Sequence, residues 1–383
     1  MATHALYVGA TLIINMKSLG PRFDNTLGET LFPEDYGKAL EHWKRLVAKL
    51  PCAHEVASFS CAQLGPQGEK LASEVLWIGE RHAPHVLVIL SGTHGIEGPA
   101  GSAIQLDLLE SLGRGEFQCP KGLAILLVHA MNPWGYAWFR RCDENGVDLN
   151  RNFVDFSVPP HNPAYREIRE TLFCTDSAQR RAKLCQYAQK MGQSAMETAV
   201  SGGQSEDPTG PFYGGRAPAH GRILTEKLMA DYALRERESI AVIDCHTGLR
   251  PFGYGEIICD HPPYSAGALC AAKWYGAGVA SPQLGTSSSV PKSGLLDYAW
   301  HNLMNSKSCF ITLEFGTLGT EQLFDVLAQD HLIWAQGCPA PQQQVAQQQR
   351  MRNHFIPQDP AWRNAVIFKA RQVIALTIRG LLG

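Results

Sequence analysis

The chain has 383 residues, of which 45% are hydrophobic and 18% are charged, and its formal net charge is −2. This composition is typical of a soluble globular protein with enough apolar residues for one large domain or two smaller ones. The sequence has no basic block with interleaved aromatic residues, and no apolar run approaches the roughly 20 residues of a membrane helix, which argues against nucleic acid and membranes as partners.

The first 31 residues do not fit the pattern of the rest. Residues 5–14 are mostly apolar, but no lysine or arginine precedes them and no convincing small-residue cleavage site follows, so they make a poor signal peptide. We expect residues 1–31 to be an extension outside the core, with Met16 as an alternative start, and residues 32–383 to form a single domain. The eleven cysteines include no C-x-x-C pair, which favours reduced cysteines and a cytoplasmic location.

The predicted elements are helices and short apolar strands. Apolar residues recur at helical spacing over residues 35–50, which predicts an amphipathic helix. Short apolar runs, most of them unbroken by polar residues, predict strands buried on both faces at residues 75–78, 86–90, 123–128, 240–245 and 309–313. Further helical periodicity is present at residues 98–112, 178–200, 222–237 and 361–381. Together these elements predict an α/β fold, a three-layer sandwich in which helices flank a mixed, largely parallel sheet.

Two segments lack this clear pattern. Residues 159–221 are polar and rich in loop-forming residues, and we expect them to elaborate the rim of a site rather than form a separate domain. Residues 339–350 are biased toward proline and glutamine, which fits either a flexible loop or a poor helix.

An H-x-x-E pattern follows the apolar run at residues 86–90. It places His94 three positions before Glu97 within S-G-T-H-G-I-E-G. A histidine and a glutamate at this spacing can bind one metal ion where a strand turns into a helix, and zinc accepts both ligands. The spacing alone is weak, because it arises often by chance.

Three further polar clusters lie close to apolar runs. The first extends over residues 132–153 and contains D-L-N-R-N-F, the second is D-C-H-T at residues 244–247, and the third is T-L-E-F-G-T at residues 312–317. In open α/β sheets, ligands bind beyond the carboxyl ends of the strands, and His94, His246 and Glu314 all fall at such ends. This shared placement groups them in one site.

The grouped side chains suit hydrolytic zinc chemistry. His94, Glu97 and His246 offer two nitrogens and a carboxylate and leave a fourth position for water, whose pKa zinc lowers to about 7. Glu314 would accept the proton of that water and later deliver it to the leaving nitrogen.

Arginines and an asparagine in the first cluster suit the remaining tasks. An arginine, either Arg140 or Arg141, would stabilise the oxyanion, and its neighbour would be solvated or paired with an acid. Asn150 and Arg151 would hold a substrate carboxylate, because guanidinium binds carboxylate in two-point geometry. The alternative is that Arg151 only braces its loop against an acid such as Asp148.

At these residues the chain resembles the zinc metallocarboxypeptidase superfamily. The resemblance lies in the order H-x-x-E, R-x8-N-R within the first cluster, D-x-H-T and L-E, and it extends from about Phe32 to the C-terminus. D-C-H-T is more similar to the aspartoacylase and succinylglutamate desuccinylase side of the superfamily. The longer phrases resemble an uncharacterised, mostly bacterial carboxypeptidase-like branch. The combined order is highly specific, although any single piece is not.

The resemblance implies roles for individual residues. It implies zinc as the cofactor, held by His94, Glu97 and His246, with Glu314 as the catalytic residue. It implies that Asp148 orients a ligand histidine through its other ring nitrogen.

It further implies Arg141 as the oxyanion residue, and Asn150 with Arg151 as the site of the substrate carboxylate. Carboxypeptidases also carry a mobile tyrosine that closes over the substrate, and here spacing does not choose among Tyr213, Tyr254 and Tyr298.

The predicted function is a cytoplasmic zinc-dependent hydrolase that cleaves an amide bond adjacent to a free carboxylate in a short peptide or a modified amino acid. One alternative is an N-acyl amino acid deacylase of aspartoacylase type, and another is a binding protein on the same fold that has lost catalysis. The complete set of ligands and base argues against the last. No G-x-S-x-G elbow and no P-loop is present, which argues against serine hydrolase and nucleotide chemistry.

Overall fold

The computed structural model describes residues 30–249 and 251–383. Nearly all of the predicted N-terminal extension, Met16 included, therefore lies outside the described residues. Leu31 is described, is 1% exposed and packs in the core. The division into an extension and a single domain stays a prediction.

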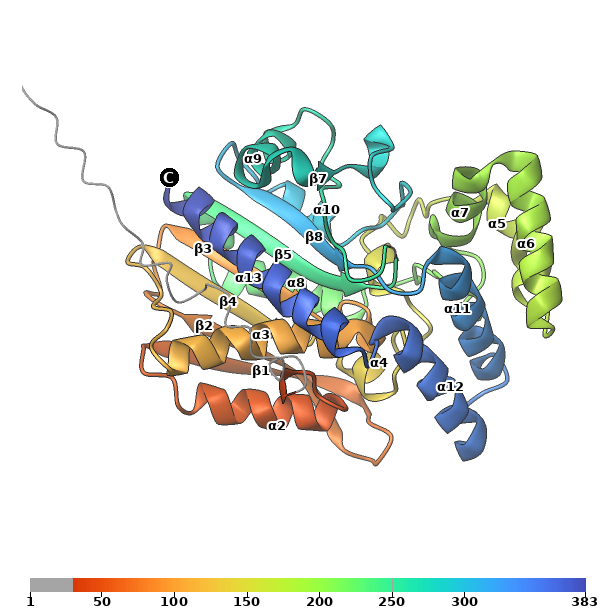
Figure 1. Cartoon of the computed structure of the whole chain (residues 1–383), viewed down its shortest axis with the longest axis horizontal. Coiled ribbons are helices and arrows are strands. Elements are labelled where there is room, and N and C mark those ends of the chain that lie inside the picture. Colours follow the sequence, from red (N-terminus) through yellow and green to blue (C-terminus); the bar gives the residue numbers. More distant parts are fainter. Residues whose placement is uncertain (1–29, 250) are drawn as a thin grey trace, which may run out of the picture.

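Eight strands form one sheet, drawn in Figure 1, with the order β1-β2-β4-β3-β5-β8-β6-β7. Their bounds are β1 (His54–Leu64), β2 (Lys70–Ile78), β3 (His85–Ser91), β4 (Leu123–His129), β5 (Ser239–Thr247), β6 (Gly255–Ile258), β7 (Val279–Ala280) and β8 (Cys309–Phe315). The central strands β4, β3, β5 and β8 are mutually parallel. On one side, β2 pairs antiparallel with both β4 and β1, and on the other side β6 pairs antiparallel with β8. The carboxyl ends of the central strands therefore lie at one edge.

Side chains alternate between the two faces of the sheet along each strand, so both faces carry apolar residues. Helices cover both faces. Leu87 and Ile89 of β3 pack in one cluster with α2 (Tyr36–Val47), α3 (Gly98–Gly113), α9 (Ala266–Tyr275) and α13 (Pro360–Leu382). Val86 and Val88 pack on the other face with α8 (His220–Asp231) and α10 (Asp297–His301). The predicted three-layer α/β sandwich is thus confirmed.

A second group of helices lies at one end of the molecule (Figure 1). It contains α5 (Pro163–Leu172), α6 (Ser177–Met191), α7 (Gln193–Ser201), α11 (Thr320–Trp334) and α12 (Pro341–Phe355). Arg180 of α6 binds Asp325 of α11 with an N–O distance of 2.8 Å. This ion pair joins helices α5–α7 to helices α11 and α12. Of residues 339–350, for which a loop and a poor helix were both open, residues 341–350 are helical and belong to α12.

Two predicted helices have different bounds in the structure. The helix predicted over residues 178–200 is two helices, because Gly192 has φ +95° and ends α6 before α7 begins. The helix predicted over residues 222–237 ends at Asp231, and Ala233 adopts a left-handed conformation with φ 46°. In the part of the chain that the structure describes, no helix is long and apolar enough to cross a membrane.

Candidate functional site

The H-x-x-E segment forms a tight turn between β3 and α3. His94 has extended backbone, the 3-10 helix η2 (Gly95–Glu97) follows, and α3 begins at Gly98. A Cβ atom on Gly95 would lie 2.0 Å from the backbone of Gly135 in α4 (Pro133–Ala137), so this close approach needs glycine. The turn brings Nδ1 of His94 to 2.9 Å from Oε1 of Glu97.

His246 reaches the same point from β5. Because β3 and β5 are neighbouring parallel strands, their carboxyl ends lie side by side. Nδ1 of His246 lies 3.1 Å from Nδ1 of His94 and 3.0 Å from Oε2 of Glu97. The backbone N–H of Thr247 donates to the same Oε2 atom at 3.0 Å. The two imidazoles and the carboxylate, all buried, therefore converge on one point.

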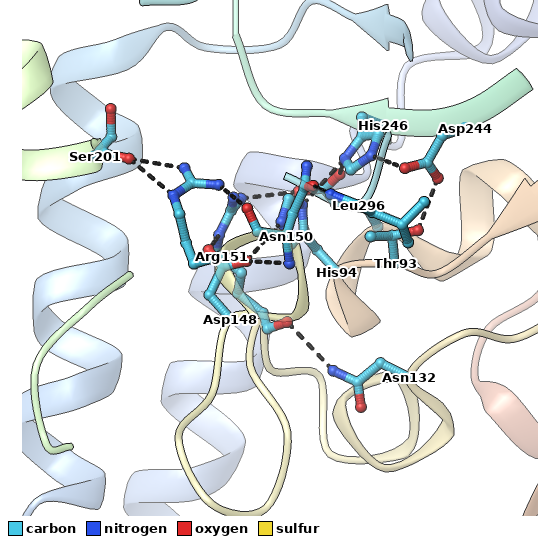
Figure 2. A network of polar contacts seen from close by, with 12 residues as sticks. Thr93, His94, Asn132, Asp148, Asn150, Arg151, Ser201, Asp244, His246 and Leu296 are labelled. Atoms are coloured by element: carbon cyan, nitrogen blue, oxygen red, sulfur yellow. Dashed lines mark hydrogen bonds and ion pairs between the residues drawn. The ribbon is translucent and has the colours of Figure 1, made fainter. Parts of the chain in front are cut away.

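A carboxylate holds the far nitrogen of each imidazole (Figure 2). Nε2 of His94 lies 3.1 Å from Oδ1 of Asp148, and Nε2 of His246 lies 2.7 Å from Oδ2 of Asp244. Thr93 donates its hydroxyl to the other oxygen of Asp244 at 2.7 Å. A neutral histidine whose Nε2–H donates to a carboxylate has its lone pair on Nδ1, so both lone pairs point at the shared centre.

This donor set fits a zinc ion. Two lone pairs 3.1 Å apart repel each other unless a proton or a cation lies between them. With neutral histidines, the imidazoles contact three carboxylates, those of Glu97, Asp148 and Asp244, and a cation between the rings would offset this negative charge. Two nitrogens and one carboxylate are a common ligand set of catalytic zinc. Within residues 30–249 and 251–383, His94, Glu97 and His246 are the only group of three such residues that meets these distances.

The charges in the cluster shift its titration. Burial by itself would raise the pKa of the Glu97 carboxyl, but His94 and His246 outweigh burial and hold that pKa below its usual value. Burial would lower the pKa of His246, but Asp244 and Glu97 raise it well above its usual value. The surrounding acids thus favour positive charge at the point where the three side chains meet.

Glu314 lies beside this cluster at the end of β8. The parallel pairing of β5 with β8 places its Cα opposite that of His246, and its side chain lines the same cavity. The backbone N–H of Leu249 donates to Oε1 of Glu314 at 3.2 Å. Burial, followed by the charge of Glu97, raises the pKa of Glu314 to about 7. The sequence prediction and the structure therefore agree on where Glu314 lies.

The adjacent arginines point to different partners. Arg141 lines the cavity and donates from Nε to Asp148 at 2.9 Å and from Nη1 to Glu97 at 3.2 Å. Arg140 donates from Nε to Asp330 of α11 at 2.8 Å, and its guanidinium lies over the ring of Trp334. Arg140 thus pairs with an acid outside the cavity, and Arg141 is the arginine that lines the cavity.

Asn150 and Arg151 lie on the 3-10 turn η3 (Leu149–Arg151). This turn of the backbone allows two adjacent side chains to reach the same cavity. Asp148 begins this turn by accepting the backbone N–H of Asn150 at 2.9 Å. Oδ1 of Asn150 accepts the N–H of Leu296 at 2.7 Å, as drawn in Figure 2, which leaves Nδ2 as the available donor. Both side chains line the cavity.

The guanidinium of Arg151 is buried and contacts carbonyl groups rather than acids. Nε and Nη2 donate to the carbonyl oxygen of Ser201 at 3.0 and 2.8 Å, and Nη1 donates to the carbonyl of Asn150. Burial lowers the pKa of Arg151 to about 10 although Asp148 opposes this shift. Among the described residues, no acid lies within ion-pair distance of Arg151, so the structure does not support bracing against Asp148.

The cavity has a volume of about 80 Å³. Besides the residues above, Asp260 and Lys292 contribute charged side chains to its wall. Neither was a candidate from the sequence, because both lie in irregular segments without a motif. Asp244 was also missed as an orienting residue, although its spacing of two from His246 on a strand places both on one face.

None of the three candidate tyrosines lines the cavity. Tyr213 is buried, Tyr254 is 50% exposed, and Tyr298 is 36% exposed and donates its hydroxyl to the carbonyl of Lys292 at 2.9 Å. The choice among them stays open.

The family model described as "Protein of unknown function (DUF2817)" matches residues 32–369. The chain belongs to this family. No curated protein matches the chain. The carboxypeptidase A of Helicoverpa armigera has a similar structure, with 13% identity, a TM-score of 0.52, and coverage of 91% of this chain and 73% of that chain.

Two bacterial structures are also similar. The succinylglutamate desuccinylase of Chromobacterium violaceum has 15% identity and a TM-score of 0.36, and the match covers 84% of this chain and 74% of that chain. The metallo-carboxypeptidase of Burkholderia cenocepacia has 12% identity and a TM-score of 0.45, with coverage of 92% and 70%. The likeness to carboxypeptidase A shows a carboxypeptidase-like fold, which confirms the fold expected from the resemblance.

Proposed function

We propose that the chain is a zinc-dependent hydrolase that cleaves an amide bond adjacent to a free carboxylate, in a short peptide or a modified amino acid. The observation that carries this proposal is the convergence of the Nδ1 atoms of His94 and His246, 3.1 Å apart, on the carboxylate of Glu97. These three side chains would hold the ion. When bound there, zinc would lower the pKa of a water molecule and polarise the carbonyl group of the substrate.

Glu314 would accept the proton of the attacking water and deliver it to the leaving nitrogen. Its position supports this role, because it lies opposite His246 in the sheet and faces the same cavity. The N–H of Leu249 holds one carboxylate oxygen, so the other remains available for a proton.

Arg141 would stabilise the negative charge that develops on the carbonyl oxygen. Two of its N–H groups are used by Asp148 and Glu97, and its remaining donors are available on the cavity side. A fixed cation next to a developing oxyanion lowers the barrier because it needs no rearrangement during the reaction.

Asn150 and Arg151 would bind the substrate carboxylate. Nδ2 of Asn150 is available because Leu296 fixes the orientation of its amide, and Arg151 retains two N–H groups beyond its three contacts to carbonyl oxygens. A buried guanidinium without a counter-ion is costly, and a bound carboxylate removes that cost.

A cytoplasmic location and a small-molecule or short-peptide partner complete the proposal. All eleven cysteines are free thiols, which supports a reducing compartment. We propose neither nucleic acid nor a membrane as a partner.

A substrate panel on zinc-loaded protein tests this function. The panel pairs N-acyl dipeptides that carry a free carboxylate with their amides, and adds N-acetyl amino acids. We expect cleavage of the free form to exceed that of the amide by about 100-fold, since each charge-assisted bond contributes about 1.5–3 kcal/mol. Cleavage of only the N-acetyl amino acids would identify a deacylase of aspartoacylase type instead.

Arg151→Ala should abolish the difference between free and amidated substrates. Arg169→Ala, which removes an arginine paired with Asp207 outside the cavity, is the control and should preserve the difference. Equal rates on free and amidated substrates in the unmodified protein would contradict the carboxylate site and favour cleavage of internal amides.

A further inference from the structure

Lys292 places a half-buried amine in the cavity wall without a contacting acid. Its Nζ donates to the hydroxyl of Ser289 and to the carbonyl of Val290, the latter at 2.8 Å. No carboxylate of the described residues lies within 4.0 Å of it. Two of the three ammonium hydrogens are thus used, and one remains.

The loop that carries Lys292 is fixed in place. Glu256 of β6 accepts the backbone N–H of Ser288 at 3.0 Å and also its hydroxyl. Tyr298 holds the carbonyl of Lys292 from the other side. The position of the ammonium group is therefore set by the protein before a ligand arrives.

Lys292 lines the same cavity as Arg151, the other cation of its wall without a contacting acid among the described residues. After burial, Arg151 is the strongest influence on the pKa of Lys292, which falls to about 8, and Asp260 opposes it. Asp260 is a weak counter-ion, because burial and the charge of Asp297 raise its own pKa to about 6. Two neighbouring cations in one cavity thus share an incomplete negative partner.

We propose that Lys292 selects an acidic residue, aspartate or glutamate, at the carboxyl end of the substrate. The ammonium group of Lys292 binds the side-chain carboxylate, while Asn150 and Arg151 bind the main-chain carboxylate. The two carboxylates of one acidic residue match two cations that line the same cavity. This inference rests on the proposed function and names its substrate class.

Kinetics on a matched peptide pair test the selection. N-acyl dipeptides ending in glutamate and in glutamine differ only in charge at the side chain. We expect kcat/KM for the glutamate peptide to exceed that for the glutamine peptide by at least about 10-fold, because only the glutamate side chain forms a charge-assisted bond with Lys292. In Lys292→Met this ratio should fall to about 1 or below. Lys273→Met, at an exposed position on α9, is the control and should keep the ratio.

A binding measurement keeps the test independent of turnover. Glutarate and its monoamide, glutaramate, have the same shape, and calorimetry on zinc-loaded protein gives both affinities. Tighter binding of glutarate by about 10-fold that disappears in Lys292→Met supports the proposal. A preference for glutarate that persists in Lys292→Met overturns it.

The two proposals fail in different ways. Hydrolysis of both peptides at equal kcat/KM overturns the selection of acidic residues and leaves the carboxypeptidase-like function in place. Hydrolysis of neither peptide, with glutarate still preferred through Lys292, overturns the function and retains the acidic ligand. If Lys292 only balances Asp260, Lys292→Met lowers the free energy of unfolding without changing either ratio, and the selection is refuted.

Discussion

Asp244→Asn tests whether the carboxylates behind the histidines tune the metal site. The amide oxygen can still accept the Nε2–H of His246, and the hydroxyl of Thr93 can rotate to meet the new amide group, so the hydrogen bonds are retained. What is lost is the negative charge 2.7 Å from the ring, which raises the basicity of the ligand nitrogen. Such partners are worth about 10–100-fold in metal affinity, or about 1.4–2.8 kcal/mol.

Competition with a chromophoric chelator at neutral pH measures this change in zinc affinity. Asp207→Asn is the matched control, because Asp207 is another buried carboxylate, bound to Arg169, and does not line the cavity. Circular dichroism and urea unfolding establish that both variants are folded. Unchanged affinity in Asp244→Asn, or an equal loss in both variants, would refute the proposed role of Asp244.

Three further predictions separate chemistry from stability. Arg141→Ala should lower turnover by about 100-fold, whereas Arg140→Ala should lower the free energy of unfolding by about 3 kcal/mol or more, and the reverse result would show that the two roles are exchanged. Glu314→Gln should retain zinc in metal analysis while turnover falls by about 100-fold or more, and unchanged turnover would remove Glu314 from the mechanism. Burial and Arg140 lower the pKa of His331 to about 3, so only the unfolded chain takes up a proton below about pH 6.5, and the protein loses stability relative to His331→Asn as pH falls. Urea unfolding should show a relative loss of about 2 kcal/mol between pH 6.5 and 5, and parallel curves would contradict the burial of a neutral His331.

Much of the site could be placed from the sequence because parallel strands end at one edge. His94, His246 and Glu314 each follow or end an apolar run, and the order of those runs brings them together once the sheet is parallel. The geometry of Asn150 and Arg151 could not be obtained in this way. Their convergence depends on the 3-10 turn that Asp148 begins, which the resemblance implied and spacing did not.

The charged residues of the cavity wall were beyond sequence pattern. Lys292 and Asp260 lie in irregular segments, where no periodicity predicts the direction of a side chain. The boundary at Gly192 was missed because a glycine within a helical pattern can be tolerated or can end the helix. The segment of residues 339–350 was ambiguous for a different reason, since its many glutamines favour helix but give no clear apolar stripe.

If zinc binds as proposed, the alternation of side chains along β5 makes zinc retention a measure of correct strand pairing. Asp244 and His246 point to one side of the strand, and Cys245 between them packs in the core on the other. Slippage of β5 by one residue would exchange these faces, burying the imidazole in the apolar layer and presenting a thiol to the cavity. A chain that pairs its strands wrongly would thus lose a ligand and its orienting acid together. The zinc content of a preparation would then report the fraction of molecules whose central strands pair in the native register. A measurement of helix content does not report this fraction.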